Sequence, residues 1–465
     1  MLNLSVMELA SVLQASCCNL PRSAETRRVI GVCTDSRRLQ PGNLFVALRG
    51  PNFDGHRFVA SAAEAGAVAA LVDHCVQAEL PQVQVDDTLR ALGALAADWR
   101  ARHTPRALGV TGSNGKTTVK NMLATILAGE APTLATRGNL NNEIGVPLTL
   151  FGLDSSVRYL VVEMGANHVG EIRYLAGIAR PQVGVITQIA PAHIEGFGSV
   201  ENVARAKAEL FEALPQDGVA VVNAEDRFQA LLRERAGGRR CLSFGTQPQA
   251  DVSVSAVVDG NVQRLQLRTP IGLIDARLAL PGRHNAMNAA AACAAAIAAG
   301  VSASAISEGL SRVVAEQGRL QTILLCGGQR LLDDTYNANP ESLRAGLEVL
   351  QALSGQHWLV LGEMGELGEA GIEYHRQVAG QARAHGVRRL FTLGEMARHA
   401  SDAFGEGALH FDDRETLSEY LRERLTRAHE ELDEPVNVLV KGSRVMRMEQ
   451  VVEVLRTEGR TCCSH

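Results

Sequence analysis

The stretch Ala107-Leu-Gly-Val-Thr-Gly-Ser-Asn-Gly-Lys-Thr-Thr118 decides the fold class of this chain. A short apolar run enters a glycine-rich turn, and a helical pattern follows the turn. A strand, a turn and a helix in this order form a phosphate cradle, because backbone N–H groups at the helix N-terminus converge on phosphate oxygens. In such a cradle Lys116 reaches the β- and γ-phosphates, and the Thr117 hydroxyl holds Mg²⁺. The sequence therefore predicts a nucleoside triphosphate site formed by Gly112, Ser113, Asn114, Gly115, Lys116, Thr117 and Thr118.

One position departs from the strict phosphate-loop pattern, because Val110 stands where its first glycine belongs. The alternative is an ordinary glycine turn with a solvated lysine. The flanking strand and helix favour the cradle, but a phosphate loop alone does not separate an ATPase, a kinase, a ligase and a nucleotide switch.

Composition excludes several classes of protein. The net charge is −5 and aromatic residues make up 4% of the 465 residues, so neither a basic field nor stacking platforms indicate nucleic-acid binding. The N-terminus lacks a signal peptide, and no apolar run is long enough to span a membrane. The nine cysteines are odd in number and contain no C-x-x-C pair, which argues against a disulfide framework or a zinc site. We expect small buried thiols in a cytoplasmic protein.

The order of apolar runs predicts an α/β fold with three regions, and the length of the chain agrees with about three domains. Residues 1–85 read as a small α/β unit. Residues 86–315 contain short apolar strands at 159–162, 183–186 and 219–222, which indicate a mostly parallel sheet, followed by antiparallel alternation over 251–280 and an alanine-rich helix over 289–299. Residues 316–465 alternate strands and helices again, as in a Rossmann-like unit.

Several polar groups follow predicted strands, where ligands bind in α/β sheets. Glu163 ends one strand and is a candidate Mg²⁺ ligand. His193 follows another, although a lone histidine is more often structural. Asp333-Asp-Thr-Tyr-Asn-Ala-Asn-Pro340 is either a ribose-binding strand end or a capped turn. Asn285 and Asn288 either cap the alanine-rich helix or contact a base edge. Lys441-Gly-Ser-Arg444 forms a cationic loop that suits an anion.

Taken together, these motifs resemble those of the Mur ligases, the ATP-dependent amide-bond-forming enzymes of peptidoglycan synthesis. The resemblance rests on Thr111–Thr118, Glu163-Met-Gly-Ala-Asn-His168, Gly282-Arg-His-Asn-Ala-Met-Asn288 and Lys441–Arg444. Three further motifs resemble the branch that adds D-alanyl-D-alanine to a UDP-muramoyl tripeptide: Thr34–Arg37 with Phe53–His56, Asn139–Pro147, and Asp333–Pro340 with Leu361-Gly-Glu-Met-Gly-Glu-Leu-Gly368. The resemblance implies a UDP-binding N-terminal domain, a central ATPase domain and a C-terminal domain that closes over the site.

The resemblance also implies roles for single residues. Lys116, His193, Lys207 and Arg319 are expected to be catalytic, with Arg319 at the γ-phosphate. Asn285 and Asn288 are expected to approach adenine, and Asp334 the ribose. Ser36, Arg37, Asn142 and Lys441 are expected to contact the substrate. Thr117, Glu163, His193 and Lys207 are expected to serve two Mg²⁺ sites, Lys207 as a carbamate, although from the residues alone Lys207 reads as a solvated helix lysine.

The expected partners are small molecules, ATP and two peptide substrates, and the chain is expected to act as a monomer. Two alternatives stay open at this point. The chain could add lysine or diaminopimelate as a third residue, or it could be a nucleotide-binding scaffold without turnover. The first is disfavoured because the C-terminal region contains no D-x-x-P-R box, which would suggest the branch that adds diaminopimelate, and Asn339-Pro340-Glu341-Ser342 instead resembles the Asn-Pro context of the dipeptide-adding branch. The second is disfavoured because Lys116, Glu163, His193, Lys207 and Arg319 are all present.

Overall fold

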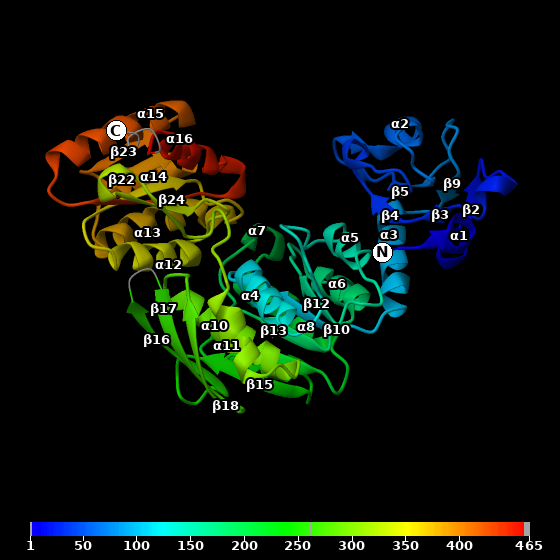
Figure 1. The fold of residues 1–465 in the computed structure, drawn as a ribbon. Helices are drawn as coiled ribbons and strands as arrows, with labels where there is room; N and C mark the ends of the chain where they lie inside the picture. The colour runs from blue at the N-terminus through cyan, green and yellow to red at the C-terminus, as the bar shows by residue number, and fades with distance from the viewer. Residues whose placement is uncertain (1, 260–261, 460–465) are drawn as a thin grey trace.

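The computed structural model describes residues 2–259 and 262–459 and contains three units, each built on its own sheet (Figure 1). The N-terminal and C-terminal units lie on opposite ends of the central one (Figure 1). The predicted α/β class is confirmed. Within the described residues, none of the helices combines the length and the apolar character needed to cross a bilayer.

The N-terminal unit has a five-stranded sheet in the order β2-β9-β8-β5-β4, in which β2 is the antiparallel strand at one edge. Its elements are β1 (Leu4–Ser5), α1 (Val6–Leu13), β2 (Ser16–Cys18), η1 (Arg22–Ala24), β3 (Arg28–Val29), β4 (Gly31–Cys33), η2 (Ser36–Arg38), β5 (Asn43–Val46), β6 (Arg49–Gly50), β7 (Phe53–Asp54), η3 (Gly55–Phe58), α2 (Val59–Glu64), β8 (Ala69–Val72) and β9 (Gln82–Gln84). Helix α3 (Thr88–Ala101) then leads to the central unit, where it packs on α5 and α6.

The central unit has a nine-stranded sheet in the order β11-β12-β10-β13-β14-β15-β16-β17-β18. It is parallel from β11 to β16, and β17 and β18 extend it as an antiparallel meander, as the sequence predicts. Its elements are β10 (Arg106–Thr111), α4 (Lys116–Ala128), β11 (Thr133–Ala135), α5 (Gly145–Leu150), β12 (Tyr159–Glu163), α6 (Glu171–Ala179), β13 (Val183–Ile186), α7 (Ile194–Phe197), α8 (Val200–Glu212), β14 (Val219–Asn223), α9 (Gln229–Arg235), β15 (Arg240–Gly245), β16 (Val252–Asp259), β17 (Val262–Thr269), β18 (Gly272–Leu278), α10 (Arg283–Ala298) and α11 (Ala303–Ser311).

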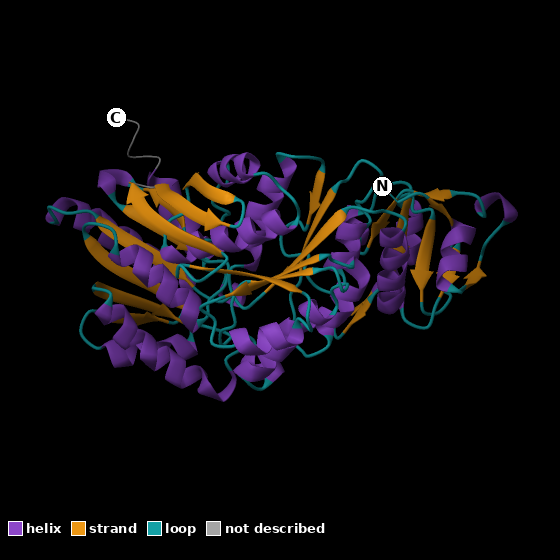
Figure 2. Cartoon of the chain, turned by 90° about the horizontal axis from the view of Figure 1, so that it is seen from below, coloured by secondary structure: helices purple, strands orange, loops and turns teal. Residues whose placement is uncertain are grey.

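The C-terminal unit has a six-stranded sheet in the order β19-β20-β24-β21-β22-β23, parallel except for the edge strand β19. Helices cover both sides of this sheet (Figure 2). Its elements are β19 (Gln321–Leu324), η4 (Cys326–Gly328), β20 (Arg330–Asp334), α12 (Pro340–Gln351), β21 (Gln356–Gly362), η5 (Gly368–Ala370), α13 (Gly371–Ala384), β22 (Val387–Leu393), α14 (Glu395–Phe404), β23 (Ala408–Phe411), α15 (Arg414–Glu431), β24 (Val436–Lys441), η6 (Arg444–Met446) and α16 (Glu449–Gly459).

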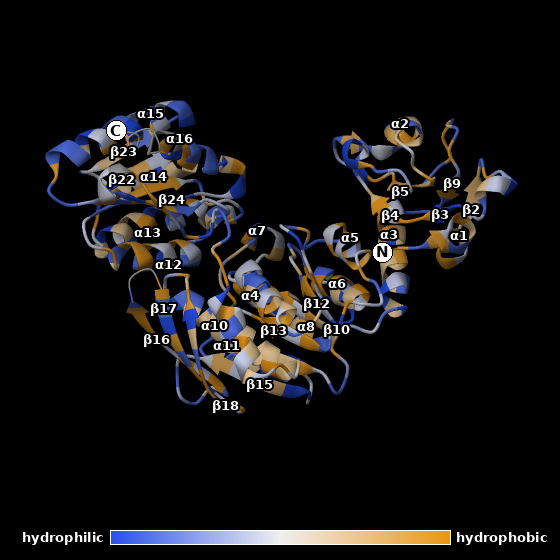
Figure 3. Ribbon diagram, viewed as in Figure 1, coloured by the Kyte–Doolittle hydropathy of each residue, from blue (hydrophilic) through white to orange (hydrophobic). Residues whose placement is uncertain are grey.

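Burial on both faces explains why the central strands read as continuous apolar runs. In β10, Ala107 packs into the core on one face, and Leu108 and Val110 pack into the core on the other. The central strands are orange in Figure 3, whereas the hairpin near β17 carries blue segments because its side chains alternate between the core and the solvent. Strand register also prepares the site, because Val110 pairs with Glu163 and brings that carboxylate beside the phosphate loop.

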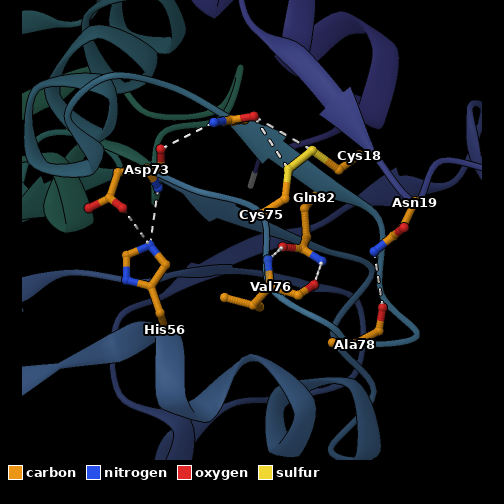
Figure 4. Close-up of a disulfide and its surroundings, with 9 residues drawn as sticks. Cys18, Asn19, His56, Asp73, Cys75, Val76, Ala78 and Gln82 are labelled. Carbon is orange, nitrogen blue, oxygen red and sulfur yellow. Dashed lines mark hydrogen bonds and ion pairs between the residues drawn. A yellow bond between two sulfur atoms is a disulfide. The ribbon is translucent and has the colours of Figure 1, made fainter.

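The prediction of unpaired cysteines is wrong at one pair, because Cys18 and Cys75 form a disulfide (Figure 4). The two residues are 57 positions apart, and the spacing gives no sign of their contact. Strand β2 pairs with β9, and the segment after β8 folds back over β9, where Val76 N–H donates to Gln82 Oε1 at 2.9 Å (Figure 4). The cysteine count therefore no longer argues for a reducing compartment.

The other described thiols fit the expectation only in part. Cys293 is buried, whereas Cys17, Cys33 and Cys241 are half-buried. Cys462 and Cys463 lie outside the described residues.

Candidate active site

The phosphate loop connects β10 to α4 and closely approaches two neighbouring segments. Gly112 has a φ of +147°, and a Cβ there would lie 2.0 Å from Thr187 Oγ1. Gly115 has a φ of +80°, and its Cβ would lie 2.5 Å from Asn288 Oδ1. Both positions therefore require glycine. With Gly115 as the left-handed N-cap, α4 begins at Lys116 and directs its first N–H groups toward the loop, as a phosphate cradle needs.

Lys116 folds back onto its own loop. Its Nζ donates to the Gly112 carbonyl at 2.8 Å and to the Ser113 carbonyl at 3.1 Å. Burial lowers the pKa of Lys116, and the nearby Glu163 carboxylate acts in the opposite direction. The ammonium group is thus held where phosphate oxygens would replace carbonyl oxygens as acceptors.

Glu163 has the chemistry of a metal ligand. Its Oε1 accepts from Thr117 Oγ1 at 3.1 Å and from Asn141 Nδ2 at 2.9 Å. Its Oε2 is buried without a hydrogen-bond partner. A buried carboxylate oxygen with no donor is costly unless a cation binds it, so Glu163 and Thr117 fit a Mg²⁺ ion. Arg319 Nη2 donates to Thr117 Oγ1 at 2.8 Å, so the positive charge of its guanidinium lies next to the residues that fit Mg²⁺.

Lys207 is buried, and the solvated interpretation of this residue is wrong. Only 2% of its surface is exposed, and its Nζ lies 3.4 Å from the Ala166 carbonyl and 5.4 Å from the centre of the Phe197 ring. Burial, followed by the positive charge of Lys116, lowers the pKa of Lys207 to about 7. Near pH 7 a large fraction of the molecules therefore carries Lys207 as a neutral amine, which is the form that reacts with CO₂.

His193 precedes α7 in a left-handed conformation with φ of +54°. Its Nδ1 lies 2.5 Å from Oε2 of Glu366, which belongs to the C-terminal unit. The imidazole is thus placed at the junction of the two units, on the wall of the same cavity as Glu163.

The C-terminal unit supplies a second wall. Asp334 ends β20, Lys441 ends β24, and the two side chains form an ion pair because these parallel strands are neighbours. Lys441 Nζ also donates to the Asn337 carbonyl at 3.0 Å. Arg319 stacks on Tyr336, with its guanidinium carbon 4.1 Å from the ring centre. Asp334, the predicted ribose-binding carboxylate, and Lys441, the predicted substrate-binding lysine, therefore form one ion pair.

The helix-cap interpretation of Asn285 and Asn288 is wrong, because Gly282 is the N-cap of α10 and no side chain caps this helix. Asn285 Nδ2 donates to the Pro281 carbonyl at 2.7 Å, and Asn288 Nδ2 donates to Asn285 Oδ1 at 3.2 Å. Both asparagines line the cavity, and Asn288 lies next to the phosphate loop at Gly115. Asn142 lies on the cavity wall as well, where its Oδ1 accepts from Gly145 N–H at 2.9 Å.

A cavity of about 910 Å³ brings most of these groups together, and Lys207 is not among its lining residues. It lies between the central and C-terminal units, and Asn114 and Asn339 bridge them, with Asn339 Nδ2 donating to Asn114 Oδ1 at 2.7 Å. The predicted residues that line it are Ser113, Asn114, Gly115, Lys116, Thr117, Thr118, Asn142, Glu163, His193, Asn285, Asn288, Arg319, Asp334 and Lys441. Such a volume suits a nucleotide together with part of a second ligand.

Two predicted substrate residues lie elsewhere, in the N-terminal unit. Ser36 begins η2 at the carboxyl end of β4, and Arg37 is mostly exposed and pairs with Asp35 at 2.8 Å. Arg49 and Asp73 follow β5 and β8 and form an ion pair of 3.2 Å at the same sheet edge. This edge is the place where α/β sheets bind ligands.

Several cavity residues were not predicted as site residues. Tyr336 and Asn339 belong to the quoted 333–340 motif, whose strand-end position is the signal that marks them. Asn141 contacts Glu163, and Glu366 contacts His193. Both contacts join segments that are distant in the sequence, and no pattern in the sequence predicts them. Burial lowers the pKa of His284 to about 4, so this lining residue is neutral at pH 7.

Comparison with known proteins places this site in a family. Residues 28–100 match the Mur ligase family catalytic domain, residues 110–296 the Mur ligase middle domain, and residues 318–444 the Mur ligase glutamate ligase domain. The UDP-N-acetylmuramoyl-tripeptide–D-alanyl-D-alanine ligase of Escherichia coli (strain K12) is 42% identical over 433 residues, which are 93% of this chain and 94% of that protein.

Solved structures agree with the sequence relatives. A crystal structure of MurF from Acinetobacter baumannii is similar with a TM-score of 0.91 and 35% identity, covering 98% of this chain and 99% of that one. MurF ligase from Thermotoga maritima in complex with ADP is similar with a TM-score of 0.81 and 26% identity, covering 95% and 100% of the two chains. These matches extend over all three units, and the chain belongs to the Mur ligase family.

Proposed function

We propose that this chain is the ATP-dependent ligase that joins D-alanyl-D-alanine to UDP-N-acetylmuramoyl-tripeptide in peptidoglycan precursor synthesis. One observation carries the proposal. A single cavity joins a phosphate loop, a buried carboxylate with an unpartnered oxygen, and the Asp334–Lys441 ion pair at two strand ends of a second unit. Two curated relatives, 42% and 36% identical over 93% and 98% of this chain, carry the name of this activity, which supports this branch of the family.

The first step transfers a phosphoryl group. The terminal carboxylate of the tripeptide attacks the γ-phosphorus of ATP, the bond to ADP breaks, and an acyl phosphate forms. Lys116 and Arg319 face the cradle and neutralise the charge that spreads over the transferring group. Asn285 and Asn288 contact the adenine, and Asp334 accepts from the ribose. Two Mg²⁺ ions, held by Thr117, Glu163, His193 and Lys207, would neutralise and align the phosphate oxygens.

Lys207 is proposed to act as a carbamate. Its neutral amine adds to CO₂, a C–N bond forms, and one proton is released to solvent. The product is an anionic oxygen ligand, whereas an ammonium group would repel Mg²⁺. Burial beside Ala166 and the lowered pKa support the reaction. Replacement of Lys207 by alanine should lower activity, and small carboxylates should partly restore it, which the ligase assay would measure.

The second step forms the amide. The amine of D-alanyl-D-alanine attacks the acyl phosphate, the tetrahedral intermediate collapses, and phosphate leaves. Because water would hydrolyse the acyl phosphate, the two walls of the cavity must stay closed during the reaction. Contacts between the central and C-terminal units, such as the Asn114–Asn339 pair, provide a physical basis for that closure.

We propose domain boundaries at residues 85 and 315. The N-terminal unit holds the UDP end of the substrate through Ser36 and Arg37, and Asn142 and Lys441 hold the peptide end. We propose that the chain acts in the cytoplasm and as a monomer, and the lining of the cavity by two units of one chain supports the second point.

The test is phosphate release with ATP and Mg²⁺ in a matrix of substrates. UDP-muramoyl tripeptide and dipeptide are each paired with D-alanyl-D-alanine, lysine and diaminopimelate. Release that requires tripeptide and D-alanyl-D-alanine is expected. Release only with the dipeptide and a diamino acid would assign the chain to the branch that adds the third residue. No release with any pair, while ATP still binds, would indicate a scaffold.

A further inference from the structure

The 361–368 motif has no role in the reaction as described above, yet its loop reaches the central unit. Met364 and Leu367 are both 3% exposed and anchor the loop in the core of the C-terminal unit. Between them Glu366 projects outward with φ of +61°. A left-handed conformation costs a non-glycine residue about 1 kcal/mol or more, so surrounding contacts must hold it.

Three contacts fix this loop from behind. Met364 N–H donates to Nε2 of the fully buried His375 at 3.0 Å, and His375 Nδ1 lies 2.7 Å from the Gly371 carbonyl. Ser443 N–H donates to the Glu363 carbonyl at 2.8 Å. The side chain of Glu366 is therefore presented from a rigid support.

Glu366 contacts His193, and both residues have a left-handed backbone conformation. His193 also has a positive φ, and its Nδ1 lies 2.5 Å from Glu366 Oε2. A second contact runs beside the first, from Glu195 N–H to the Glu366 carbonyl at 3.5 Å. In Figure 1, α7, which starts directly after His193, lies on the side of the central unit that faces the C-terminal unit. Two constrained residues from two units thus form one contact at the cavity wall.

We infer that Glu366 is a positioning residue that holds His193 Nδ1 and thereby directs His193 Nε2 toward the metal site only while the C-terminal unit is seated on the central one. The inference rests on the proposed function, because His193 binds metal only in that reaction. A carboxylate on one ring nitrogen sets the tautomer and orientation of the other nitrogen, and its loss weakens metal binding about 10–100-fold. By reciprocity, metal binding must then favour closure of the two units.

The experiment uses Mn²⁺ with a non-hydrolysable ATP analogue and the full-length protein. Electron spin-echo spectroscopy detects the ¹⁴N coupling of a histidine bound to Mn²⁺, and titration gives the Mn²⁺ affinity. The intact chain should show the coupling. Glu366→Ala should lose most of it, bind Mn²⁺ about 10–100-fold more weakly and show a larger radius of gyration by X-ray scattering. Glu366→Gln retains an acceptor for Nδ1–H and should recover part of the coupling.

The matched control is Glu369→Ala, which removes an exposed carboxylate three residues further along. It should leave the coupling, the affinity and the scattering unchanged. A Glu366→Ala protein with the coupling and Mn²⁺ affinity of the intact chain would overturn the inference. A lack of coupling in the intact chain would overturn it together with the metal role of His193. The substrate matrix for phosphate release decides the proposed function independently of both outcomes.

Discussion

Lys116 is the residue on which phosphoryl transfer depends most directly. Its ammonium donates to two carbonyls of its own loop, and these contacts hold the side chain in place. We predict that Lys116→Ala lowers phosphate release by at least about 10²–10³-fold, the usual loss when one donor to a transition-state charge is removed. The thermal unfolding midpoint without nucleotide should stay close to that of the intact chain.

The comparison variant is Lys116→Arg, which keeps the charge but not the shape of the side chain. It should retain nucleotide binding better than Lys116→Ala. Turnover by Lys116→Ala at the rate of the intact chain would refute the phosphate-loop assignment.

Lys207 allows a sharper test, because the chain contains only four lysines: Lys116, Lys120, Lys207 and Lys441. Because its pKa is lowered to about 7, the amine of Lys207 is mostly protonated below pH 7 and mostly neutral above it. At a fixed concentration of dissolved CO₂, the formation of the carbamate therefore depends on pH in two different ways. Below pH 7 each carbamate formed releases two protons, one from the ammonium and one from the addition. Above pH 7 it releases one. We predict that the ratio of carbamate to free lysine rises steeply below pH 7 and half as steeply above it.

Carbon-13 resonance spectra of the metal-free protein under labelled CO₂ would measure this ratio. The signal should disappear in Lys207→Ala and persist in Lys120→Arg. A change of slope near pH 10 instead of pH 7 would show that Lys207 titrates as a solvated lysine.

At the scale of an element, the alanine-rich composition of helix α10 determines how closely it packs against its neighbours. Its alanines at 289–292 and 294–296 are almost completely buried, and the helix packs against α4 and the strands β14, β15 and β16. Small side chains allow this close approach, and they leave no room for larger ones. We predict that Ala292→Leu lowers the free energy of unfolding by about 1–3 kcal/mol, the typical cost of overpacking. Ile297→Leu, at a half-buried position of the same helix, should cost less than about 1.5 kcal/mol.

Urea unfolding followed by the fluorescence of Trp99 would measure the difference. Trp99 lies in α3, next to the central unit, and a Trp358→Phe background removes the other tryptophan. An Ala292→Leu protein as stable as the Ile297→Leu protein would mean that α10 has space that its packing does not suggest.

The Cys18–Cys75 disulfide ties an edge strand to the connection between β8 and β9. The bond closes a loop of 57 residues, for which the chain-entropy account gives a stabilisation of about 4 kcal/mol. We predict that Cys18→Ser with Cys75→Ser lowers the stability of the N-terminal unit by up to this amount. Cys33→Ser removes an unpaired thiol and should have a smaller effect.

Thiol titration under denaturing conditions checks the bond itself. The intact chain should gain two reactive thiols on reduction, and this gain should be absent in the double serine variant. Equal thiol counts before and after reduction would contradict the disulfide.

Elements with a regular pattern could be predicted from the sequence, and contacts between distant segments could not. The strands near 159–162, 183–186 and 219–222 and the alanine-rich helix follow directly from periodicity. Short edge strands such as β11 and β19 were missed, because their few residues carry little pattern. The burial of Lys207 and the Glu366–His193 contact depend on packing between elements far apart in the chain, which a linear pattern does not encode.

At the scale of the whole molecule, the central question is how the nucleotide couples the units. Arg319 belongs to the segment that enters the C-terminal unit, yet its guanidinium donates to Thr117 on the phosphate loop and stacks on Tyr336. A triphosphate in the cradle would lie between these partners. Arg319 is therefore one residue, beside Asp334 and the Glu366–His193 contact, through which a ligand on the central unit can stabilise the C-terminal one.

The two tryptophans report on the two units separately, Trp99 beside the central unit and Trp358 in β21 of the C-terminal unit. A ligand that binds only the native state stabilises by about 2.7 kcal/mol at a concentration of 100 Kd. With a non-hydrolysable ATP analogue and Mg²⁺, we predict that both unfolding transitions of the intact chain shift upward. In Arg319→Ala at the same saturation, the Trp99 transition should shift as before and the Trp358 transition should shift less than in the intact chain. Arg376→Ala, which removes an exposed cation of α13, should behave like the intact chain. A Trp358 transition that shifts in Arg319→Ala as far as in the intact chain would mean that the two units are coupled by other contacts, such as Asn114 with Asn339, and that Arg319 acts on the phosphate alone.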